Sequence, residues 1–387
     1  MAMAADRLEH PRILVADDQA DIILALEALL KNRGYEIRSA TSPAAALEAL
    51  RASSFDLVLM DLNYSRRTDS VREGIDLLAR IEEVDPLIPV VVMTAWGSID
   101  LAVEAMNIGA ANFIQKPWNN ARLVELVRDE IERGRSRRRS EHRRTEEKQE
   151  IEEAGEVQRA FLPPSLPQVE ACEMAVRWQP MGRLGGDYYD VFLLDDRRLR
   201  FCVADASGKG LPAALLMSNL QAGLRSLADS SAGPAETVTR LNRLFCANRL
   251  TNKFFTLFYG VLDLGRGELT YSNAGHPPPI VRHREGGLSS LKGTGGLVGC
   301  FPDWTYRQES VRLAPGDRIW LYTDGLSEAR DAAGGEFGPA RMERLIDEFH
   351  AAPLAEAQDR VWNAVLEFCG GTLEDDATLL TFHLRDV

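Results

Sequence analysis

Four short segments in the C-terminal half each place aspartate in a turn of small residues. Each segment adjoins an apolar run, so each carboxylate is expected at the end of a strand. Clustered carboxylates repel one another unless a hard cation neutralises them, and ligand sets made only of oxygen suit Mg²⁺ or Mn²⁺. A two-metal site of this kind can generate a nucleophilic hydroxide and clamp a phosphoryl group, so the pattern predicts a metal-dependent phosphatase. The segments are Gly185-Gly186-Asp187, Ala204-Asp205-Ala206-Ser207-Gly208, Tyr322-Thr323-Asp324-Gly325 and Asp375-Asp376-Ala377-Thr378.

A second set of polar residues follows apolar runs in the N-terminal half. Asp17-Asp18, Asp61, Thr94 and Lys116 come in this order just after successive predicted strands. In a doubly wound sheet, such positions meet at the carboxyl edge, where ligands bind. Taken singly, each residue is an ordinary cap or turn residue. Together they predict one Mg²⁺ held by three carboxylates, with Asp61 as phosphoryl acceptor and with Lys116 and Thr94 contacting the phosphoryl group.

The elements that must position this second set alternate between strands and helices from Arg12 to about Arg133. Continuous apolar strands in such an alternation predict a parallel sheet covered by helices on both faces. The helix expected after the first strand is Ala20–Lys31, which stops at Asn32-Arg33-Gly34. The predicted strands are Ile13–Ala16, Phe55–Met60, Pro89–Met93 and Ala111–Ile114.

This arrangement resembles the receiver domain of bacterial two-component response regulators, over residues 11–133. The resemblance implies an α/β doubly wound parallel sheet of the flavodoxin-like kind and phosphorylation of Asp61 by a sensor histidine kinase. It also implies Mg²⁺ bound by Asp17, Asp18 and Asp61, with Phe113 at the aromatic switch position beside Thr94 and Lys116. The segment Asn63–Gly74 is longer than the compact loop usual in this family. This departure bears on how long the phosphoryl group would last on Asp61, not on the role of Asp61 as its acceptor.

A charged linker is expected over residues 134–160. Arg133–Arg144 is rich in arginine and Glu146–Glu156 is rich in glutamate, with strong helix formers and no proline. A parallel pair of such helices would stack like charges, so it would be weak or switchable. A homodimer formed through this linker and a merely solvated spacer both remain open.

The C-terminal half has strands between glycine-rich turns, with helices in two groups, and this pattern predicts an α+β antiparallel β-sandwich flanked by helices. The predicted strands are Met174–Gln179, Tyr188–Leu194, Leu199–Ala204, Thr256–Asp263, Leu269–Asn273, Arg318–Tyr322 and Ala377–His383. The predicted helices are Pro212–Leu227, Ala235–Arg249, Pro339–Phe349 and Leu354–Cys369.

The four aspartate segments, together with Asn273-Ala274-Gly275-His276-Pro277-Pro278, resemble the PPM-type (type 2C) Ser/Thr phosphatases, and more narrowly their bacterial SpoIIE-like branch. The phosphatase domain is expected over 161–387, and Glu156–Pro163 resembles the helix that enters the domain in this branch. The resemblance implies a phosphoserine or phosphothreonine protein phosphatase acting without a phosphoenzyme, with an anti-sigma-factor antagonist as substrate. It implies two Mn²⁺ or Mg²⁺ ions, and the implied ligands and catalytic groups are Asp187, Asp205, the Ala206 carbonyl, Asp324 and Asp375, with Asp376 as an adjacent candidate.

The chain departs from the eukaryotic branch at Ala206-Ser207, where that branch has Gly-His, so a histidine general acid is absent there. His276 lies in a tight turn and is expected to hold the fold rather than to catalyse. Lys209 is interpreted either as a phosphate ligand or as a solvated charge. The two helices Pro212–Leu227 and Ala235–Arg249 are expected to reposition Asp205 on activation.

Two other functions are open. The C-terminal half could be a catalytically silent module that binds phosphoproteins under control of the receiver. Alternatively, the receiver could be the functional part of the protein and the C-terminal half a dimerisation scaffold. The presence of all four aspartate segments favours the enzyme, because a silent relative is expected to lose one of them.

The composition of the 387-residue chain is that of a globular protein large enough for two domains. A formal net charge of −13 argues against nucleic acid as a partner. No apolar stretch approaches a membrane span and Met1–Pro11 lacks a signal-peptide core, so no membrane contact and a cytoplasmic location are expected. The five cysteines form no CxxC pair and are predicted to be buried thiols.

Overall fold

The structure, a computed structural model, describes residues 10–64, 70–94, 99–227, 232–247 and 253–386. The chain forms two compact units, Met1–Lys148 and Gln149–Val387. Part of the long segment predicted after Asp61, residues 65–69, lies outside the described residues, and so do residues 1–9 of the N-terminal segment.

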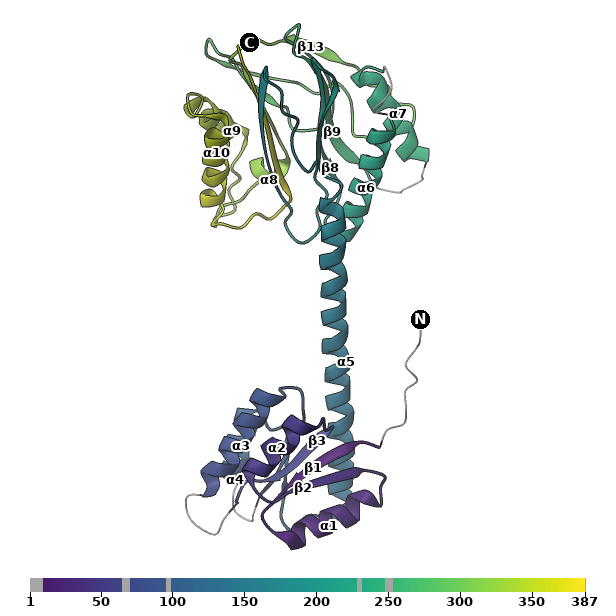
Figure 1. Cartoon of the computed structure of the whole chain (residues 1–387), viewed down its shortest axis with the longest axis vertical. Helices are drawn as coiled ribbons and strands as arrows, with labels where there is room; N and C mark the ends of the chain where they lie inside the picture. The colour runs from purple at the N-terminus through teal and green to yellow at the C-terminus, as the bar shows by residue number, and fades with distance from the viewer. Residues whose placement is uncertain (1–9, 65–69, 95–98, 228–231, 248–252, 387) are drawn as a thin grey trace. The chain divides into compact units, whose positions relative to one another are not determined.

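The first unit is a five-stranded parallel sheet in the order β2-β1-β3-β4-β5, which confirms the predicted doubly wound fold. β3 and β4 are buried at every position, as expected of strands covered on both faces. Figure 1 shows the helices packed around this sheet. The elements are β1 (Arg12–Ala16), α1 (Ala20–Lys31), β2 (Glu36–Ala40), α2 (Pro43–Ala52), β3 (Leu57–Asp61), α3 (Ser70–Val84), β4 (Val90–Thr94), α4 (Ile99–Ile108) and β5 (Asn112–Gln115).

Strand β2 was not among the strands predicted from the sequence. It lies at the edge of the sheet, and only its last residue, Ala40, is buried. Its sequence Glu-Ile-Arg-Ser-Ala therefore lacks the apolar run that marks the central strands.

Helix α5 (Asn120–Arg159) begins in the first unit and ends in the second. Its first turns bury Leu123, Val127 and Ile131 at a spacing of four residues against the sheet. Every residue of the stretch 139–153 is exposed. The middle of the predicted charged linker is therefore the solvated part of a 40-residue helix.

The second unit contains two five-stranded sheets, β13-β10-β9-β8-β7 and β12-β11-β14-β15-β6, in which every strand pairing is antiparallel. Their inner faces share one core, in which the rings of Phe201 and Phe382 lie 4.4 Å apart. The strands are β6 (Cys172–Gln179), β7 (Tyr188–Asp195), β8 (Arg198–Ala206), β9 (Phe255–Asp263), β10 (Glu268–Ala274), β11 (Ile280–Arg282), β12 (Leu288–Ser290), β13 (Glu309–Arg312), β14 (Arg318–Tyr322) and β15 (Ala377–Leu384).

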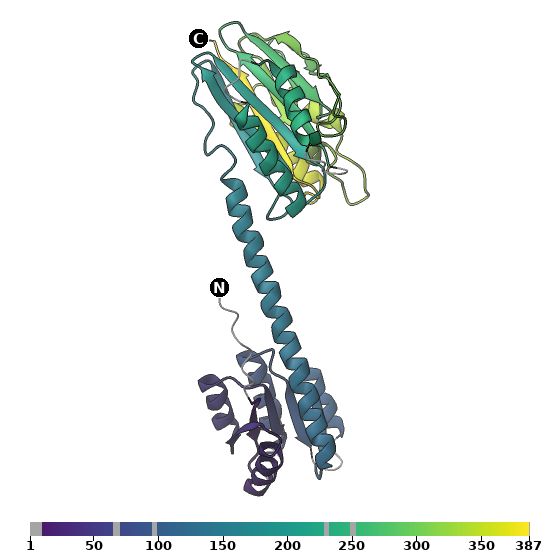
Figure 2. The same cartoon turned by 90° about the vertical axis from the view of Figure 1, so that its right-hand side faces the viewer.

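Helices cover both outer faces of this sandwich (Figure 1), which confirms the predicted α+β class. Helices α6 and α7 pack on β8, β9 and β10, and Figure 2 looks onto the face that they cover. On the opposite face, α9 and α10 pack on β6, β11 and β15. The helices are α6 (Leu211–Ser226), α7 (Pro234–Ala247), α8 (Asp324–Ser327), α9 (Pro339–Glu348) and α10 (Leu354–Phe368).

The cysteines only partly follow the prediction of buried thiols. All five are free, and Cys172 and Cys202 are buried. Cys300 is exposed, so the prediction was wrong there: it lies in a turn beside the exposed Phe301 rather than in a strand. None of the helices in the described ranges combines the length and the apolar composition needed to cross a bilayer.

Candidate functional site

The first unit gathers its predicted polar residues at the carboxyl edge of the sheet. Asp17, Asp18 and Asp61 bring carboxylate oxygens within 4.8 Å of one another. Asp17 and Asp61 are buried while Asp18 is exposed, so the cluster lies at the surface end of the strands. Burial raises the pKa of Asp61, because the carboxylate loses water and faces the charge of Asp17.

Lys116 partly neutralises this cluster. Its Nζ lies 2.7 Å from Oδ2 of Asp17 and 2.8 Å from Oδ2 of Asp61. One ammonium group opposite three carboxylates leaves an excess of negative charge, and the donor atoms are all oxygen. These residues therefore fit a hard divalent cation such as Mg²⁺.

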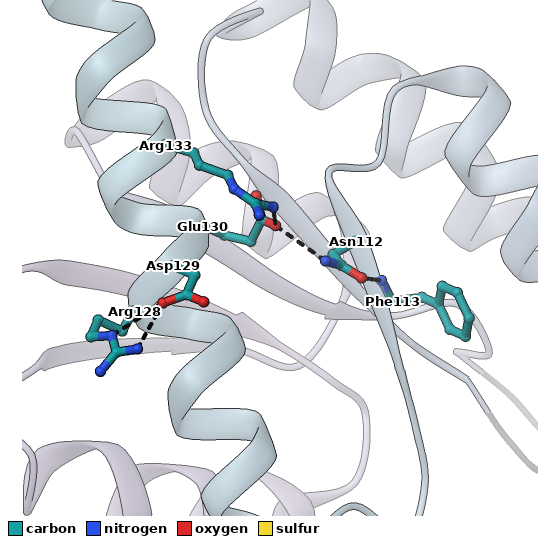
Figure 3. Close-up of polar contacts among 6 residues, drawn as sticks. All are labelled: Asn112, Phe113, Arg128, Asp129, Glu130 and Arg133. Atoms are coloured by element: carbon teal, nitrogen blue, oxygen red, sulfur yellow. Dashed lines mark hydrogen bonds and ion pairs between the residues drawn. The ribbon is translucent and has the colours of Figure 1, made fainter.

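The other two predicted receiver residues differ in exposure. Thr94 ends β4 and is buried, whereas Phe113 is 44% exposed. Figure 3 shows how β5 is tied to α5 beside Phe113. Oδ1 of Asn112 accepts from the Phe113 N–H, and Nδ2 of Asn112 donates to the buried carboxylate of Glu130, which also pairs with Arg133. Arg128 and Asp129 form a separate, exposed pair on the same helix.

In the second unit, the predicted aspartates all lie at strand ends. Asp187 immediately precedes β7, and Asp205 is the penultimate residue of β8, which pairs with β7. Asp324 begins α8 and is separated by one residue from the end of β14, and Asp375 is separated by one residue from the start of β15, which pairs with β14. The acidic ends of both sheets therefore come together on the same side of the sandwich, because Thr323 and Thr378 from the second sheet both contact Asp187.

Asp187 is the most enclosed of these carboxylates, with an exposed fraction of 1%. Its Oδ2 accepts from the hydroxyls of Thr323 at 2.7 Å and Thr378 at 2.6 Å, while its Oδ1 has no hydrogen-bond partner. Burial and the neighbouring charge of Asp205 raise the pKa of Asp187 well above its ordinary value. A buried carboxylate oxygen left without a donor is costly unless a cation binds it.

The other carboxylates of this half repel one another in the same way. Burial raises the pKa of Asp205 to about 8, with further contributions from Asp324, Asp375 and Asp376. Burial also raises the pKa of Asp324. Within the described ranges, no three of these aspartates bring carboxylate oxygens within 4.8 Å of one another, so the structure gathers them at one edge without closing them into a ligand cluster. The all-oxygen donors and the unpaired Oδ1 of Asp187 fit Mn²⁺ or Mg²⁺.

Asp376 has different surroundings from its neighbour Asp375. Its Oδ1 accepts from the N–H of Met181 at 2.7 Å and its Oδ2 from the N–H of Gly186 at 2.6 Å. Asp375 is more exposed, and its Oδ2 pairs with Lys209 at 2.8 Å. The contacts of Asp376 are those of a group that holds the loop before Asp187, whereas Asp375 faces the open side of the site.

Lys209 contacts the site rather than bulk water alone. Its Nζ donates to the carbonyl of Glu374 at 2.6 Å, and its ion pair with Asp375 raises the pKa of the amine. A cavity of about 230 Å³ opens beside it, and its lining includes two of the predicted site aspartates, two glutamates and two cationic side chains. The lining residues are Lys209, Asp324, Gly325, Glu328, Ala329, Arg330, Glu374 and Asp375.

His276 makes the contacts expected of a residue that holds the fold. It is buried, its N–H donates to Oδ1 of Asn273, and its Nδ1 lies 2.9 Å from the hydroxyl of Thr256. Burial lowers its pKa to about 3, so the imidazole is neutral near pH 7.

Sequence reasoning missed three residues that support the site. Thr323 and Thr378 were quoted within the aspartate segments, but no role was given to their hydroxyls. Gln158 of α5 forms two hydrogen bonds with the backbone of Gly185. The roles of the threonines could have been predicted from their positions close to Asp324 and Asp376 in the sequence. Gln158 is 27 residues away from its partner Gly185, so the sequence around it does not indicate this contact.

Comparisons with known proteins agree with this geometry. The family model described as "Response regulator receiver domain" matches residues 13–128, and the one described as "Stage II sporulation protein E (SpoIIE)" matches residues 195–385. The phosphoserine phosphatase RsbU of Bacillus subtilis is 31% identical over 237 residues, which are 61% of this chain and 70% of RsbU. The chain belongs to the SpoIIE family of PP2C-type protein serine/threonine phosphatases.

Two further relatives extend the comparison of this SpoIIE-family chain. The SiaA-PP2C domain of Pseudomonas aeruginosa matches with a TM-score of 0.56 at 25% identity, covering 62% of this chain and 98% of that domain. Protein IcfG of Synechocystis sp. is 32% identical over 264 residues, and the match covers 60% of this chain but only 41% of IcfG. Metal dependence is typical of PP2C-type phosphatases, in agreement with the donor set around Asp187.

Proposed function

We propose that this chain is a response regulator in which phosphorylation of Asp61 controls a metal-dependent phosphoserine or phosphothreonine protein phosphatase. The observation that carries the catalytic half is the buried Asp187 carboxylate, which keeps one oxygen unpaired in a site with four further aspartates. The relatives RsbU and RsbP of Bacillus subtilis, both named as phosphoserine phosphatases, support the same class of substrate.

Each residue of the phosphatase site has a proposed role. Asp187 and Asp205, with the Ala206 carbonyl, would hold the metal ions together with Asp324 and Asp375, while Asp376 fixes the loop. When bound, two Mn²⁺ or Mg²⁺ ions would supply an activated water and neutralise charge on the phosphoryl oxygens. Thr323 and Thr378 orient Asp187 through its Oδ2, which leaves Oδ1 for the cation.

Two cationic side chains, Lys209 and Arg330, line the 230 Å³ cavity, and they are proposed to bind the phosphorylated side chain of the substrate. Lys209 pairs with Asp375 at this cavity, and its ammonium group would donate to the phosphoryl oxygens of the substrate. Arg330 lines the same cavity and pairs with Glu336 at 3.1 Å. A substrate with a phosphoserine in an exposed segment fits this open, polar site.

The receiver half is proposed to bind one Mg²⁺ at Asp17, Asp18 and Asp61 and to accept a phosphoryl group from a sensor histidine kinase. Thr94 and Lys116 would contact that group, and Phe113 would respond to it. The link from Phe113 through Asn112 to Glu130 connects β5 with α5, the helix that continues into the phosphatase unit. Phosphorylation would act through this helix, by changing how two copies associate or by moving α6 and α7 near Asp205.

The pathway proposed for this chain is partner switching in the cytoplasm, with an anti-sigma-factor antagonist as substrate and a homodimer formed through α5. We also propose that the receiver domain ends at residue 133 and that the phosphatase domain begins after residue 160. Hydrogen exchange in α6 and α7 that is unchanged by phosphorylation would count against the proposed activation route.

Hydrolysis of an aryl phosphate with added Mn²⁺ tests the catalytic half. The proposal predicts turnover that requires the metal and is lost in Asp187→Ala, while Asp196→Ala, in the exposed turn between β7 and β8, retains it. Binding of a phosphoserine protein without hydrolysis under any metal would indicate the silent binding module instead.

A further inference from the structure

The last turns of α5 contact the loop that leads to Asp187. Nε2 of Gln158 donates to the carbonyl of Gly185 at 2.5 Å, and the N–H of Gly185 donates back to Oε1 of Gln158 at 3.0 Å. Gln158 is 3% exposed, so the amide pairs with both polar groups of one peptide residue away from water. Without Gln158, both groups of Gly185 would be buried without a partner.

Gly185 and Gly186 are also closely packed by groups other than Gln158. A Cβ added at Gly185 would lie 2.9 Å from Oδ1 of Asp376, and one added at Gly186 would lie 2.9 Å from the carbonyl oxygen of Ala206. Gly186 also donates to Asp376 and accepts from the N–H of Ala206 at 3.3 Å. A shift of Gly185 therefore moves Asp187, which follows two residues later, relative to the Ala206 carbonyl.

The helix fits closely against the same loop one turn before Gln158. A Cβ added at Gly155 would lie 2.5 Å from the carbonyl oxygen of Arg183. Glu152, a further turn back, pairs with Arg183 at 2.9 Å across an exposed surface. Residues 152, 155 and 158 are three apart and lie on one face of the helix, so this face is fitted to the loop.

We propose that Gln158 is a positioning residue that sets the affinity of the phosphatase site for its metal ions. It contacts neither metal ligands nor substrate, and it acts through Gly185 on the placement of Asp187. A change in how the end of α5 packs would reach the metal site through this amide. The inference rests on the proposed phosphatase function for its site, but metal binding measures it without turnover.

Gln158→Met tests the inference, because Met matches Gln in length and helix propensity but makes neither hydrogen bond. The matched control is Gln149→Met, at an exposed position of the same helix. Mn²⁺ binding is followed from the electron paramagnetic resonance signal of free Mn²⁺, with binding to Asp187→Ala subtracted to remove the receiver contribution. The Mn²⁺ concentration for half-saturation should rise about tenfold or more in Gln158→Met and stay unchanged in the control.

Turnover separates positioning from a general loss of structure. At saturating Mn²⁺, kcat of Gln158→Met should stay within about threefold of the wild type, because the ligands are intact. Gly155→Ala keeps the Gln158 amide but displaces the helix, so it should also raise the Mn²⁺ concentration needed for half-saturation. An unchanged Mn²⁺ affinity in a folded Gln158→Met, or a loss of kcat that saturating Mn²⁺ does not restore, overturns the inference. If the wild type binds Mn²⁺ at this site without hydrolysing phosphoserine protein, the proposed function fails while the binding result still decides this inference.

Discussion

Replacing Asp205 by asparagine should stabilise the metal-free protein, although it removes a proposed metal ligand. The pKa of Asp205 is raised to about 8, whereas an unfolded aspartate titrates at about 3.9. Near pH 7, folding therefore forces this carboxyl to take up a proton. At about 1.4 kcal/mol per pKa unit, the roughly three units up to pH 7 set an upper limit of about 4 kcal/mol on this cost. The neighbouring carboxylates share part of the cost, so we expect a gain of about 2 kcal/mol in the free energy of unfolding.

Thermal unfolding in the presence of a chelator measures this gain. For a domain of this size, the expected increase in Tm is about 4–8 °C near pH 7. Because the folded pKa is raised, the wild type loses stability as pH rises from the unfolded value towards the folded one. The advantage of Asp205→Asn should therefore shrink near pH 5. Asp196→Asn, in the exposed turn between β7 and β8, is the matched control and should leave Tm unchanged.

Adding Mn²⁺ should reverse the order of the two Tm values, so that the wild type melts above Asp205→Asn. A ligand at about one hundred times its Kd stabilises the wild type by about 2.7 kcal/mol, and Asp205→Asn should lose most of this effect. The reasoning is refuted if the variant melts at or below the wild type in chelator near pH 7, or if Mn²⁺ stabilises both proteins equally.

Three further changes probe other parts of the phosphatase unit. Arg225→Gln leaves the buried Asp190 without its ion pair, 2.7 Å in length, so the free energy of unfolding should fall by about 2 kcal/mol in denaturant titrations. Thr378→Val removes one of two hydroxyls on Asp187, and a Mn²⁺ titration should show half-saturation at about five times the concentration or more; an unchanged value would argue against this hydroxyl. The pH–rate profile between about pH 5.5 and 8.5 should have the same shape in wild type and His276→Gln, since the pKa of His276, lowered to about 3, lies outside that range.

The sequence predicted the strand-end aspartates well, because each of them lies in a local motif. Asp187, Asp205 and Asp324 were expected at strand ends, and the structure has them there. The local signal could not separate Asp375 from Asp376, since both follow the same turn. Only the tertiary contacts assign Asp376 to the backbone of Gly186 and Asp375 to Lys209.

Other features depend on long-range contacts that leave little trace in the sequence. Strand β2 lies at a sheet edge with mostly exposed residues, so it lacked an apolar run. The segment around Gln158 was associated with entry into the phosphatase domain, but its partner Gly185 is determined by packing. Likewise, the charge pattern predicted a helical linker over residues 134–160, but it did not predict that this helix is continuous with the one whose first turns pack on the receiver core.

The central claim is that phosphorylation of Asp61 controls a metal-dependent phosphatase. The most direct test is Mn²⁺-dependent hydrolysis of a phosphoserine protein by the full chain, with and without beryllofluoride as a mimic of the phosphorylated receiver. The account predicts metal-dependent turnover that changes with beryllofluoride in the wild type and does not change in Asp61→Asn. Turnover that is identical with and without beryllofluoride, in a protein whose receiver binds it, would contradict the account.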